Sequence, residues 1–342
     1  MTIENLEKQL KTGNLDRLYL FYGDEQFLLD SCVKKIKTLF GECVKGINYI
    51  LIDDTNVGEI ISDIETPSFG YEKKLILAKN TGIFKKEGKR KTGENSKLKE
   101  KLLGFLQDNL DIVRQSVFLV FVEQEVEKQE LVTFFEKNGI VCKFDFQNPM
   151  QIQARLQSIC NSYKVKVDAP TLQYLIECCG TSMQDLINEI RKLIEYAGEG
   201  GIIQKKDIDQ LCIKKLESVI FDLTDNLGKR NVSKALEVLQ NLLYAKEPLQ
   251  RILVTLYNHF KKLYLTKLAL KYKKDMVTSL NLKPNQTFLV NKYKMQASYF
   301  KEEDLRGILQ SLADLDYEYK TGIIDLLVGL QTVLCKYCGS NA

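Results

Sequence analysis

The sequence predicts an α/β domain with a mostly parallel sheet, followed by two all-α domains. In the first part of the chain, short apolar runs with strand character alternate with segments whose apolar residues recur at helical spacing. Beyond Pro149, nearly every segment has the 3.6-residue period of an amphipathic helix. At 342 residues, the chain is also too long for one simple core. We therefore expect an α/β domain at 1–147 and helical domains at 148–213 and 214–342.

The strands of the first domain are expected to be buried on both faces, because they are nearly continuous apolar runs. The strand–helix–strand order predicts that neighbouring strands are parallel. Asp24 is placed to cap the first helix that follows a strand. The expected strands span 18–22, 48–53, 74–80, 116–123 and 141–146, and the expected helices between them span 24–40, 56–69, 98–110 and 128–139.

The helical part is predicted from capping residues as well as from periodicity. Pro170 lies near the first turn of one expected helix, and Gly180 and Gly198 lie where two helices should end. The single histidine, His259, sits beside an apolar seam and is interpreted as structural. The expected helices span 150–167, 168–180, 181–198, 204–212, 218–229, 231–247, 248–274, 287–300 and 301–338.

The first strand–helix junction has the position of a phosphate-binding loop but lacks its residues. Such a loop follows the pattern G-x-x-x-x-G-K-[ST], whose backbone amides, lysine and hydroxyl hold phosphate and magnesium. Gly23 matches the first glycine, but Leu28 and Leu29 replace the second glycine and the lysine. Asp24 and Glu25 would repel a phosphate. The sequence therefore predicts a degenerate P-loop.

Other catalytic signatures are also missing from the sequence. The expected strand at 116–123 ends in Glu123, and Glu125 follows two residues later. Neither belongs to an Asp-Glu pair of the kind that ATPases use to bind magnesium and to activate water. No Ser-Arg-Cys motif occurs, and one histidine leaves little scope for histidine-based acid–base or metal chemistry. We expect no catalytic residues and no cofactor in this chain.

Cysteine use and hydropathy indicate a cytoplasmic protein. The nine cysteines are interpreted as reduced thiols that mostly fill the core. Cys335 and Cys338 form a lone C-x-x-C, whereas a tetrahedral zinc site needs four ligands, so no metal site is expected. The first residues lack a signal-peptide pattern, and no apolar run approaches the roughly 20 residues of a membrane span. No membrane partner is expected.

Positive charge is concentrated in one segment, Lys85–Lys101. This segment has a net charge of +5, whereas the whole chain carries +4, so the remaining residues sum to −1. One interpretation is a solvated loop. The other is a contact with the nucleic-acid backbone through Lys89, Arg90 and Lys91, which would weaken with salt.

Five stretches in order along the chain resemble the delta subunit family of bacterial DNA polymerase III clamp loaders. The resemblance implies an AAA+-like first domain without Walker motifs, then a helical lid domain and a collar domain that joins a ring of loader subunits. It also implies a protein that opens the sliding clamp for loading on primed DNA, while sister subunits hydrolyse ATP. The matching stretches are "LYLFYGDEQFLLDS", "ETPSFGYEKKLILAKN", "CCGTSMQDLINEIRKLIEYAG", "LYNHFKKLYLTKLAL" and "FLVNKYKMQASYFKEEDL".

The resemblance also implies a clamp contact at Pro67, Ser68, Phe69 and Gly70. In the family, two adjacent bulky apolar residues at this place enter a pocket of the clamp. Phe69 matches the second of them, whereas Ser68 stands where leucine or phenylalanine is more usual. The alternative interpretation is that Phe69 is a core residue at a helix-to-strand turn.

Three functions remain open from the sequence. The first is a non-catalytic clamp-loader subunit, which as a single chain is not an enzyme but would belong to a DNA polymerase holoenzyme with nucleotidyltransferase activity. The second is a weak or atypical NTPase with an unusual phosphate loop. The third is a stand-alone nucleic-acid-binding protein that uses Lys85–Lys101.

Overall fold

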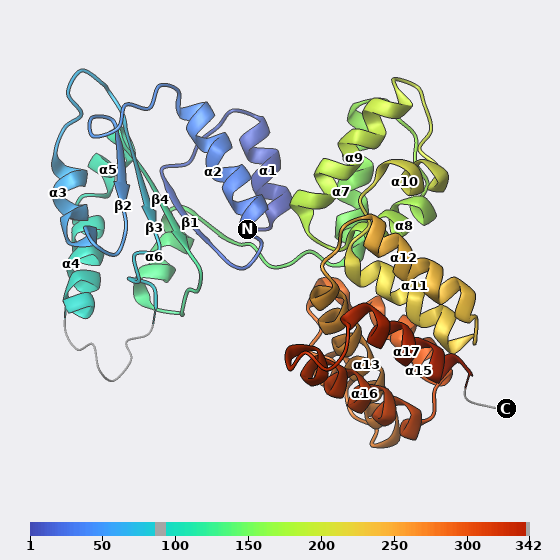
Figure 1. The fold of residues 1–342 in the computed structure, drawn as a ribbon. Helices are drawn as coiled ribbons and strands as arrows, with labels where there is room; N and C mark the ends of the chain where they lie inside the picture. Colours follow the sequence, from blue (N-terminus) through green and yellow to red (C-terminus); the bar gives the residue numbers. More distant parts are fainter. Residues whose placement is uncertain (86–93, 340–342) are drawn as a thin grey trace. The chain divides into compact units, whose positions relative to one another are not determined.

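The computed structural model describes residues 1–85 and 94–339 (Figure 1). The chain divides into two compact units, Met1–Phe146 and Gln147–Ala342. A further boundary near residue 213, between a lid domain and a collar domain, stays a prediction. Within the described residues, none of the helices combines the length and the apolar character that crossing a membrane requires.

The first unit is built on a five-stranded sheet in which all paired strands are parallel, in the order β2-β3-β4-β1-β5. Every residue of the central strand β4 is buried. This arrangement confirms the predicted α/β domain with a mostly parallel sheet. The strands are β1 (Leu18–Tyr22), β2 (Tyr49–Ile52), β3 (Lys74–Lys79), β4 (Val117–Glu123) and β5 (Ile140–Lys143).

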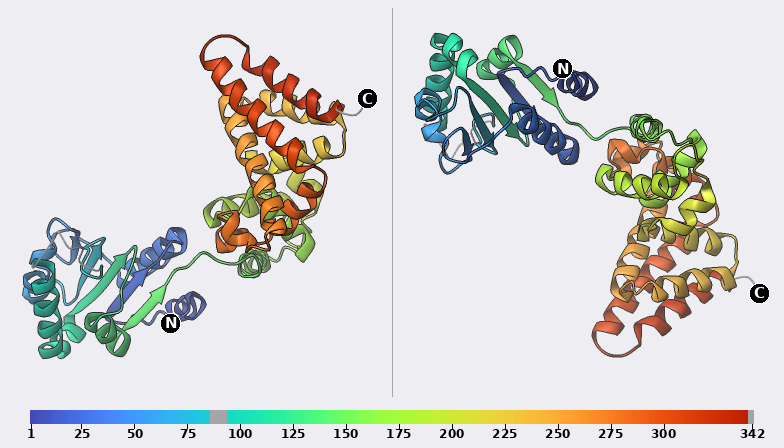
Figure 2. Two further views of the ribbon diagram at one scale, coloured as in Figure 1. Left: turned by 90° about the horizontal axis from the view of Figure 1, so that it is seen from below. Right: turned by 90° about the horizontal axis from the view of Figure 1, so that it is seen from above.

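Helices cover both faces of the sheet, as the apolar strands require (Figures 1 and 2). Tyr19 and Phe21 of β1 face the core under α1 and α2, whereas Leu18 and Leu20 face the opposite core, under α3 to α6. These helices are α1 (Ile3–Lys11), α2 (Gln26–Phe40), α3 (Ile60–Glu65), α4 (Glu94–Asp108), α5 (Leu110–Ser116) and α6 (Glu130–Asn138), and a 3₁₀ turn, η1 (Val57–Glu59), precedes α3.

Several details of the first unit differ from the sequence-based expectation. Helix α1 was not expected, although its buried residues have helical spacing. The N-cap of α2 is Glu25, so the prediction for Asp24 is wrong: the Glu25 amide is already bonded to the Phe144 carbonyl, and the helix begins one residue later. Helix α3 ends at Glu65, well before Phe69. The residues after it therefore form a loop.

Every secondary-structure element described in the second unit, up to residue 339, is a helix, which confirms the predicted all-α remainder of the chain (Figure 2). The expected helix at 301–338 is two helices that meet near Gly322, whose φ of +74° suits a turn. The helices are α7 (Pro149–Ser162), α8 (Ala169–Cys179), α9 (Met183–Ala197), α10 (Lys205–Leu211), α11 (Leu216–Gly228), α12 (Val232–Tyr244), α13 (Leu249–Lys271), α14 (Met276–Ser279), α15 (Leu289–Ser298), α16 (Glu302–Lys320) and α17 (Leu326–Gly339), with a 3₁₀ turn, η2 (Pro284–Gln286).

The ends of the helices in the second unit follow from their capping residues. Asn148 begins α7 with a capping box, and the Asp168 side chain accepts from the Thr171 amide at the start of α8. Gly180 ends α8 with a φ of +80°, as predicted from its position. His259 is buried within α13, and its Nε2 lies 2.8 Å from Gln296 Oε1. The histidine therefore has a structural hydrogen bond.

Candidate functional site

The junction between β1 and α2 uses its polar groups within the fold. Only Gly23, Asp24 and Glu25 lie between the strand and the helix. The Glu25 amide donates to the Phe144 carbonyl at 2.9 Å, and the Gln26 side chain donates to the Gly23 carbonyl at 2.8 Å. A phosphate site at a helix N-terminus needs amides that point at the ligand. This junction offers a short loop whose Glu25 amide is already bonded.

The need for glycine at position 23 is explained by the close approach of two chain segments. Its φ is +125°, and a Cβ added there would lie 2.4 Å from the Phe144 carbonyl oxygen. A real Cβ cannot approach an oxygen so closely, so the backbone would have to shift. Glycine is therefore needed at this point for packing against the residues that follow β5, independently of any phosphate.

The carboxylate at the end of β4 is also held inside the fold. Glu123 is buried, and its Oε1 accepts from the Thr81 amide at 2.9 Å and from the Thr81 hydroxyl at 2.5 Å. Burial raises the pKa of Glu123, although these hydrogen bonds oppose that change. Glu125, two residues further on, is exposed. The two carboxylates therefore lie in different environments, unlike the paired acidic groups of a magnesium-dependent ATPase.

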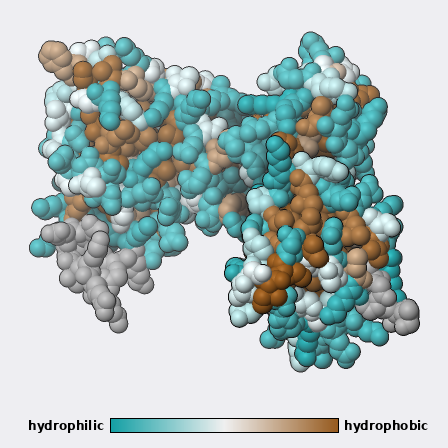
Figure 3. Space-filling view, viewed as in Figure 1, coloured by the Kyte–Doolittle hydropathy of each residue, from teal (hydrophilic) through white to brown (hydrophobic). Residues whose placement is uncertain are grey.

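Phe69 is the most exposed large hydrophobic side chain among the described residues, at 90%. It lies in the loop between α3 and β3, which we call the Phe69 loop and define as residues 66–73. Hydrophobic residues are visible on the surface of both units among mostly hydrophilic ones (Figure 3), and in the first unit Ile47, Leu51 and Ile112 are also exposed. Phe69 is thus not a core residue.

The other predicted residues of this site lie beside Phe69 in the same loop. Pro67 is exposed, Ser68 is half-buried, and Gly70 is exposed with a φ of +77° and open space around it. The Tyr71 amide donates to the Ser68 carbonyl at 3.4 Å, which closes a turn around Phe69 and Gly70. The structure therefore brings all four predicted residues together at one exposed turn.

The base of the Phe69 loop is held by a buried lysine that sequence reasoning missed. The Lys74 ammonium donates to the Asp63 carbonyl at 2.6 Å and also to the Thr66 carbonyl. Burial lowers the pKa of Lys74, while the Asp63 carboxylate opposes that change. On the far side of the turn, desolvation and the nearby Glu42 carboxylate raise the pKa of Tyr71. The base of the turn is thus attached to α3 through Lys74.

The predicted contacts with the nucleic-acid backbone, Lys89, Arg90 and Lys91, lie outside the described residues. At the edges of that segment, the Lys99 ammonium donates to the Lys85 carbonyl at 2.8 Å. The contribution of the three basic residues to nucleic-acid binding stays a prediction.

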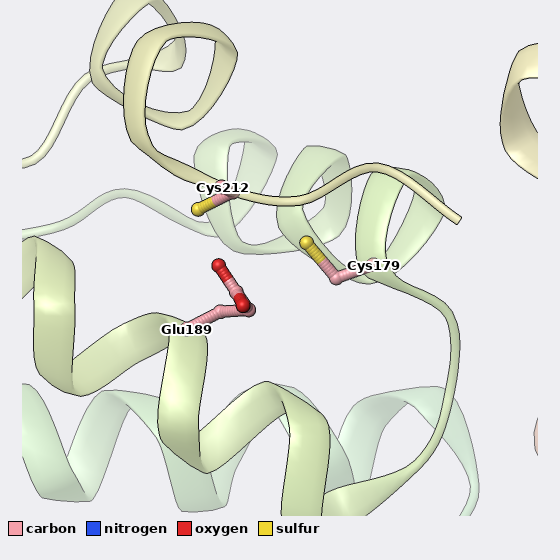
Figure 4. Close-up of side chains that lie close together, drawn as sticks. All are labelled: Cys179, Glu189 and Cys212. Atoms are coloured by element: carbon pink, nitrogen blue, oxygen red, sulfur yellow. The ribbon is translucent and has the colours of Figure 1, made fainter. Parts of the chain in front are cut away.

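A second polar cluster, in the helical unit, was not predicted from the sequence. Cys179, Glu189 and Cys212 converge from α8, α9 and the end of α10, and one ligand atom of each lies within 4.8 Å of the others (Figure 4). The hydrogen bond between the two thiols lowers the pKa of Cys179 and raises that of Cys212. In the C-x-x-C pair at the end of the chain, Cys335 is exposed, and the side chain of Cys338 lies outside the described residues.

Known proteins resemble this chain over nearly its whole length. The "DNA polymerase III subunit delta" of Bacillus subtilis is 25% identical over 342 residues, which is 98% of this chain and 96% of that protein. The "Probable DNA polymerase III subunit delta" of Aquifex aeolicus is 29% identical over 317 residues, which is 88% of this chain and 85% of that protein. The solved structure of the Bacillus subtilis DNA clamp loader delta protein shares the fold, with a TM-score of 0.76, 23% identity, and coverage of 98% of this chain and 99% of that one.

The fold defines a protein with a parallel α/β domain and an all-helical remainder, whose first strand–helix junction lacks the second glycine and the lysine of a P-loop. Two family models match this chain: "DNA polymerase III, delta subunit" at residues 19–145 and "DNA polymerase III delta subunit, C-terminal domain" at residues 217–337. Together they cover well over half of the sequence. The chain belongs to the DNA polymerase III delta subunit family, which functions in DNA replication.

Proposed function

We propose that this chain binds the sliding clamp through the Phe69 loop and opens it for loading on primed DNA. It would act within a ring of clamp-loader subunits and leave ATP hydrolysis to the others. The observation that carries the proposal is the 90% exposure of Phe69 at a turn whose base is attached to α3 through Lys74. The names of the relatives support the role, since they are delta subunits of DNA polymerase III and of a clamp loader.

An exposed phenylalanine on a held turn is suited to anchor a protein interface. Full burial of a phenylalanine side chain contributes about 1.5–3 kcal/mol, and aromatic anchors in apolar pockets commonly act as binding hot spots. Because Lys74 attaches the base of the turn and the Tyr71 amide closes it, less conformational entropy is lost when Phe69 enters a pocket. Phe69 is therefore expected to contribute most of the affinity of this loop.

The geometry of the β1–α2 junction favours a non-catalytic subunit over an atypical NTPase. The Glu25 amide and the Gln26 side chain are engaged with Phe144 and Gly23 carbonyls, and Glu123 is engaged with Thr81. The sequence supplies no lysine at position 29 to offset phosphate charge. Titration of the purified chain with ATP and magnesium in a calorimeter should show no binding in the micromolar range.

The clamp contact is tested by measuring the affinity of the cognate clamp for wild-type chain and for Phe69→Ala. We expect at least about a 30-fold loss, the equivalent of about 2 kcal/mol. Ile112→Ala is the matched control, because Ile112 is also an exposed apolar residue of the first unit, 57% exposed. Circular dichroism of each variant should match the wild-type spectrum. Equal affinities for wild type and folded Phe69→Ala would reject Phe69 as the anchor.

Clamp opening needs a separate readout from clamp binding. A fluorophore and a quencher on either side of one subunit interface of the clamp report the separation of that interface. Wild-type chain should raise the fluorescence, and Phe69→Ala should do so only at concentrations that restore binding. If wild type binds the clamp with no change in fluorescence, this chain binds without opening the clamp on its own.

Within the loader complex, the basic segment Lys85–Lys101 would make a supporting contact with primed DNA. Lys89, Arg90 and Lys91 would bind backbone phosphates, and removal of each positive charge should lower the salt dependence of DNA binding. The triple substitution of these residues by glutamine should flatten the plot of log affinity against log salt for the assembled loader. An unchanged slope would remove the segment from the DNA interface.

A further inference from the structure

The cluster of Cys179, Glu189 and Cys212 brings together donor atoms from three helical segments that are far apart in sequence. Cys179 is the last residue of α8, Glu189 lies in the middle of α9, and Cys212 is the C-cap of α10. Cys179 and Glu189 are buried and Cys212 is half-buried. The three side chains point toward a common centre (Figure 4). This convergence is the geometry that a metal ion requires.

The donor types select the class of metal. Two thiols and one carboxylate form a soft, anionic set, which suits Zn²⁺ and disfavours Mg²⁺ or Ca²⁺. With Zn–S near 2.3 Å and Zn–O near 2.0–2.2 Å, tetrahedral ligands lie about 3.5–3.8 Å from one another. The donor atoms here lie within 4.8 Å of one another. The largest separation allowed by this limit exceeds the tetrahedral value by about 1 Å, so metal binding needs only a small inward movement of the side chains.

We propose that Cys179, Glu189 and Cys212 bind one Zn²⁺ ion, with water as the fourth ligand. Binding converts two thiols into thiolates, so Zn²⁺ enters and two protons leave while the carboxylate stays ionised. The ion would join the end of α8, the middle of α9 and the end of α10. Its role would be to stabilise this helical region, separately from the clamp contact.

The surroundings of Glu189 already orient its carboxylate for this role. Its Oε2 atom pairs with the Lys192 ammonium at 2.6 Å and accepts from the Ile213 amide at 3.3 Å. Metal-ligating carboxylates are commonly held by hydrogen bonds of this kind. The other oxygen is then available to the ion. Two thiolates, one carboxylate and Zn²⁺ sum to −1, and Lys192 offsets that charge.

The neighbouring cysteine provides a matched control. Cys178 adjoins Cys179 in α8 and is also buried, but it is not one of the three residues of the cluster. Cys178→Ser therefore removes a buried thiol from the same turn of the same helix without removing a proposed ligand. Any effect shared by Cys178→Ser and Cys179→Ser comes from the loss of a buried thiol.

The test uses the full chain, reduced and stripped of metal with a chelator. Titration with Co²⁺ should give one equivalent of a sulfur-to-cobalt charge-transfer absorbance and the visible bands of a tetrahedral ion. Zn²⁺, measured in competition with a chromophoric chelator, should bind with a stoichiometry of one. We expect Cys179→Ser and Cys212→Ser to bind Zn²⁺ at least about 100-fold more weakly, since even the loss of an outer partner costs 10–100-fold. Glu189→Gln should weaken binding while keeping two thiolates in the Co²⁺ spectrum.

Melting curves provide a second readout. Zn²⁺ should raise the melting temperature of wild type and of Cys178→Ser but leave that of Cys212→Ser unchanged. The proposal is overturned if wild type holds less than about one tenth of an equivalent of Zn²⁺, or if folded Cys212→Ser binds as tightly as wild type. Isolation of the untreated chain with Cys179 and Cys212 joined in a disulfide would also overturn it, because a disulfide leaves no thiolate for a metal.

Discussion

The side-chain nitrogen of Lys74 lies 2.6 Å from the backbone carbonyl oxygen of Asp63, eleven positions earlier in the chain. The same ammonium group also donates to the Thr66 carbonyl, so it caps the end of α3. Carbonyls in the last turn of a helix have no partner within the helix, and a positive charge there interacts favourably with the helix dipole. Phe69 follows Thr66 by three residues, so this cap fixes where the Phe69 loop leaves α3.

Replacement of Lys74 by methionine should destabilise the first unit and weaken clamp binding. Methionine keeps the apolar stem but leaves two carbonyls without their donor, which costs about 1–3 kcal/mol. Urea unfolding should show this loss in the free energy of unfolding. Lys73→Met is the control, because Lys73 is the exposed neighbour of the buried Lys74.

Clamp affinity of the folded Lys74→Met variant separates stability from positioning. If Lys74 positions Phe69, the affinity should fall severalfold under conditions in which the variant is fully folded. Wild-type affinity together with reduced stability would limit Lys74 to a structural role.

Substitution of Ser68 by leucine should strengthen clamp binding. Ser68 is half-buried beside Phe69, at the place where the family resemblance implies a bulky apolar residue. If half of the value of a fully buried leucine is realised, the gain is about 1 kcal/mol, which is about fivefold in affinity. The double variant Ser68→Leu/Phe69→Ala should stay weak. A leucine that leaves the affinity unchanged would show that Ser68 lies outside the clamp contact.

The sheet and most helices could be predicted because their signals are local. Five apolar runs gave the five strands, and the missing lysine at position 29 pointed to a degenerate P-loop. The sequence placed Phe69 at the end of an expected helix at 56–69, whereas α3 ends at Glu65 and Phe69 lies in the loop that follows. The sequence left open whether Phe69 is buried, since a bulky residue between a helix and a strand can face either way. Its exposed fraction of 90% decided that question.

The features that sequence reasoning missed depend on contacts between distant positions. Lys74 begins a strand, and nothing in its neighbours indicates that its side chain turns back to cap α3. Cys179 and Cys212 are 33 positions apart with no repeated spacing, and only the packing of α8, α9 and α10 brings them together around Glu189. Metal-site patterns that rely on short spacing cannot find such a set.

Gly23→Ala should destabilise the first unit strongly, although Gly23 lies where a phosphate loop would be. The added methyl group would lie 2.4 Å from the Phe144 carbonyl oxygen, and the φ of +125° is unfavourable for alanine. We expect a loss of at least about 2 kcal/mol in urea unfolding. Gly13→Ala is the control, because Gly13 has a φ of +82° but open space around it. Equal losses in the two variants would mean that backbone strain, and not contact with Phe144, explains Gly23.

His259 gives the second unit a defined response to acid. Gln296 donates its amide group to the Phe221 carbonyl and to Asp225, both at 2.8 Å, so its oxygen faces His259 Nε2 and that nitrogen carries the proton. Burial lowers the pKa of His259 from 6.5 to about 4, with nearby Lys262 acting in the same direction. The unfolded chain therefore binds a proton more readily than the folded chain between pH 6.5 and 4.

Stability should accordingly fall as the pH is lowered through that window, by about 3 kcal/mol at pH 4 relative to pH 7. The measurement is the free energy of urea unfolding of wild type and of His259→Gln at several pH values, taken from the unfolding transition of the second unit. Buried carboxyls whose pKa is raised, such as Asp222, have the opposite effect and stabilise the folded state as the pH falls. They are present in both proteins, so their effect cancels when the two stability curves are subtracted. The chain has one histidine, so the difference between the two curves reports His259 alone. Parallel curves would show that His259 is accessible to protons in the folded state.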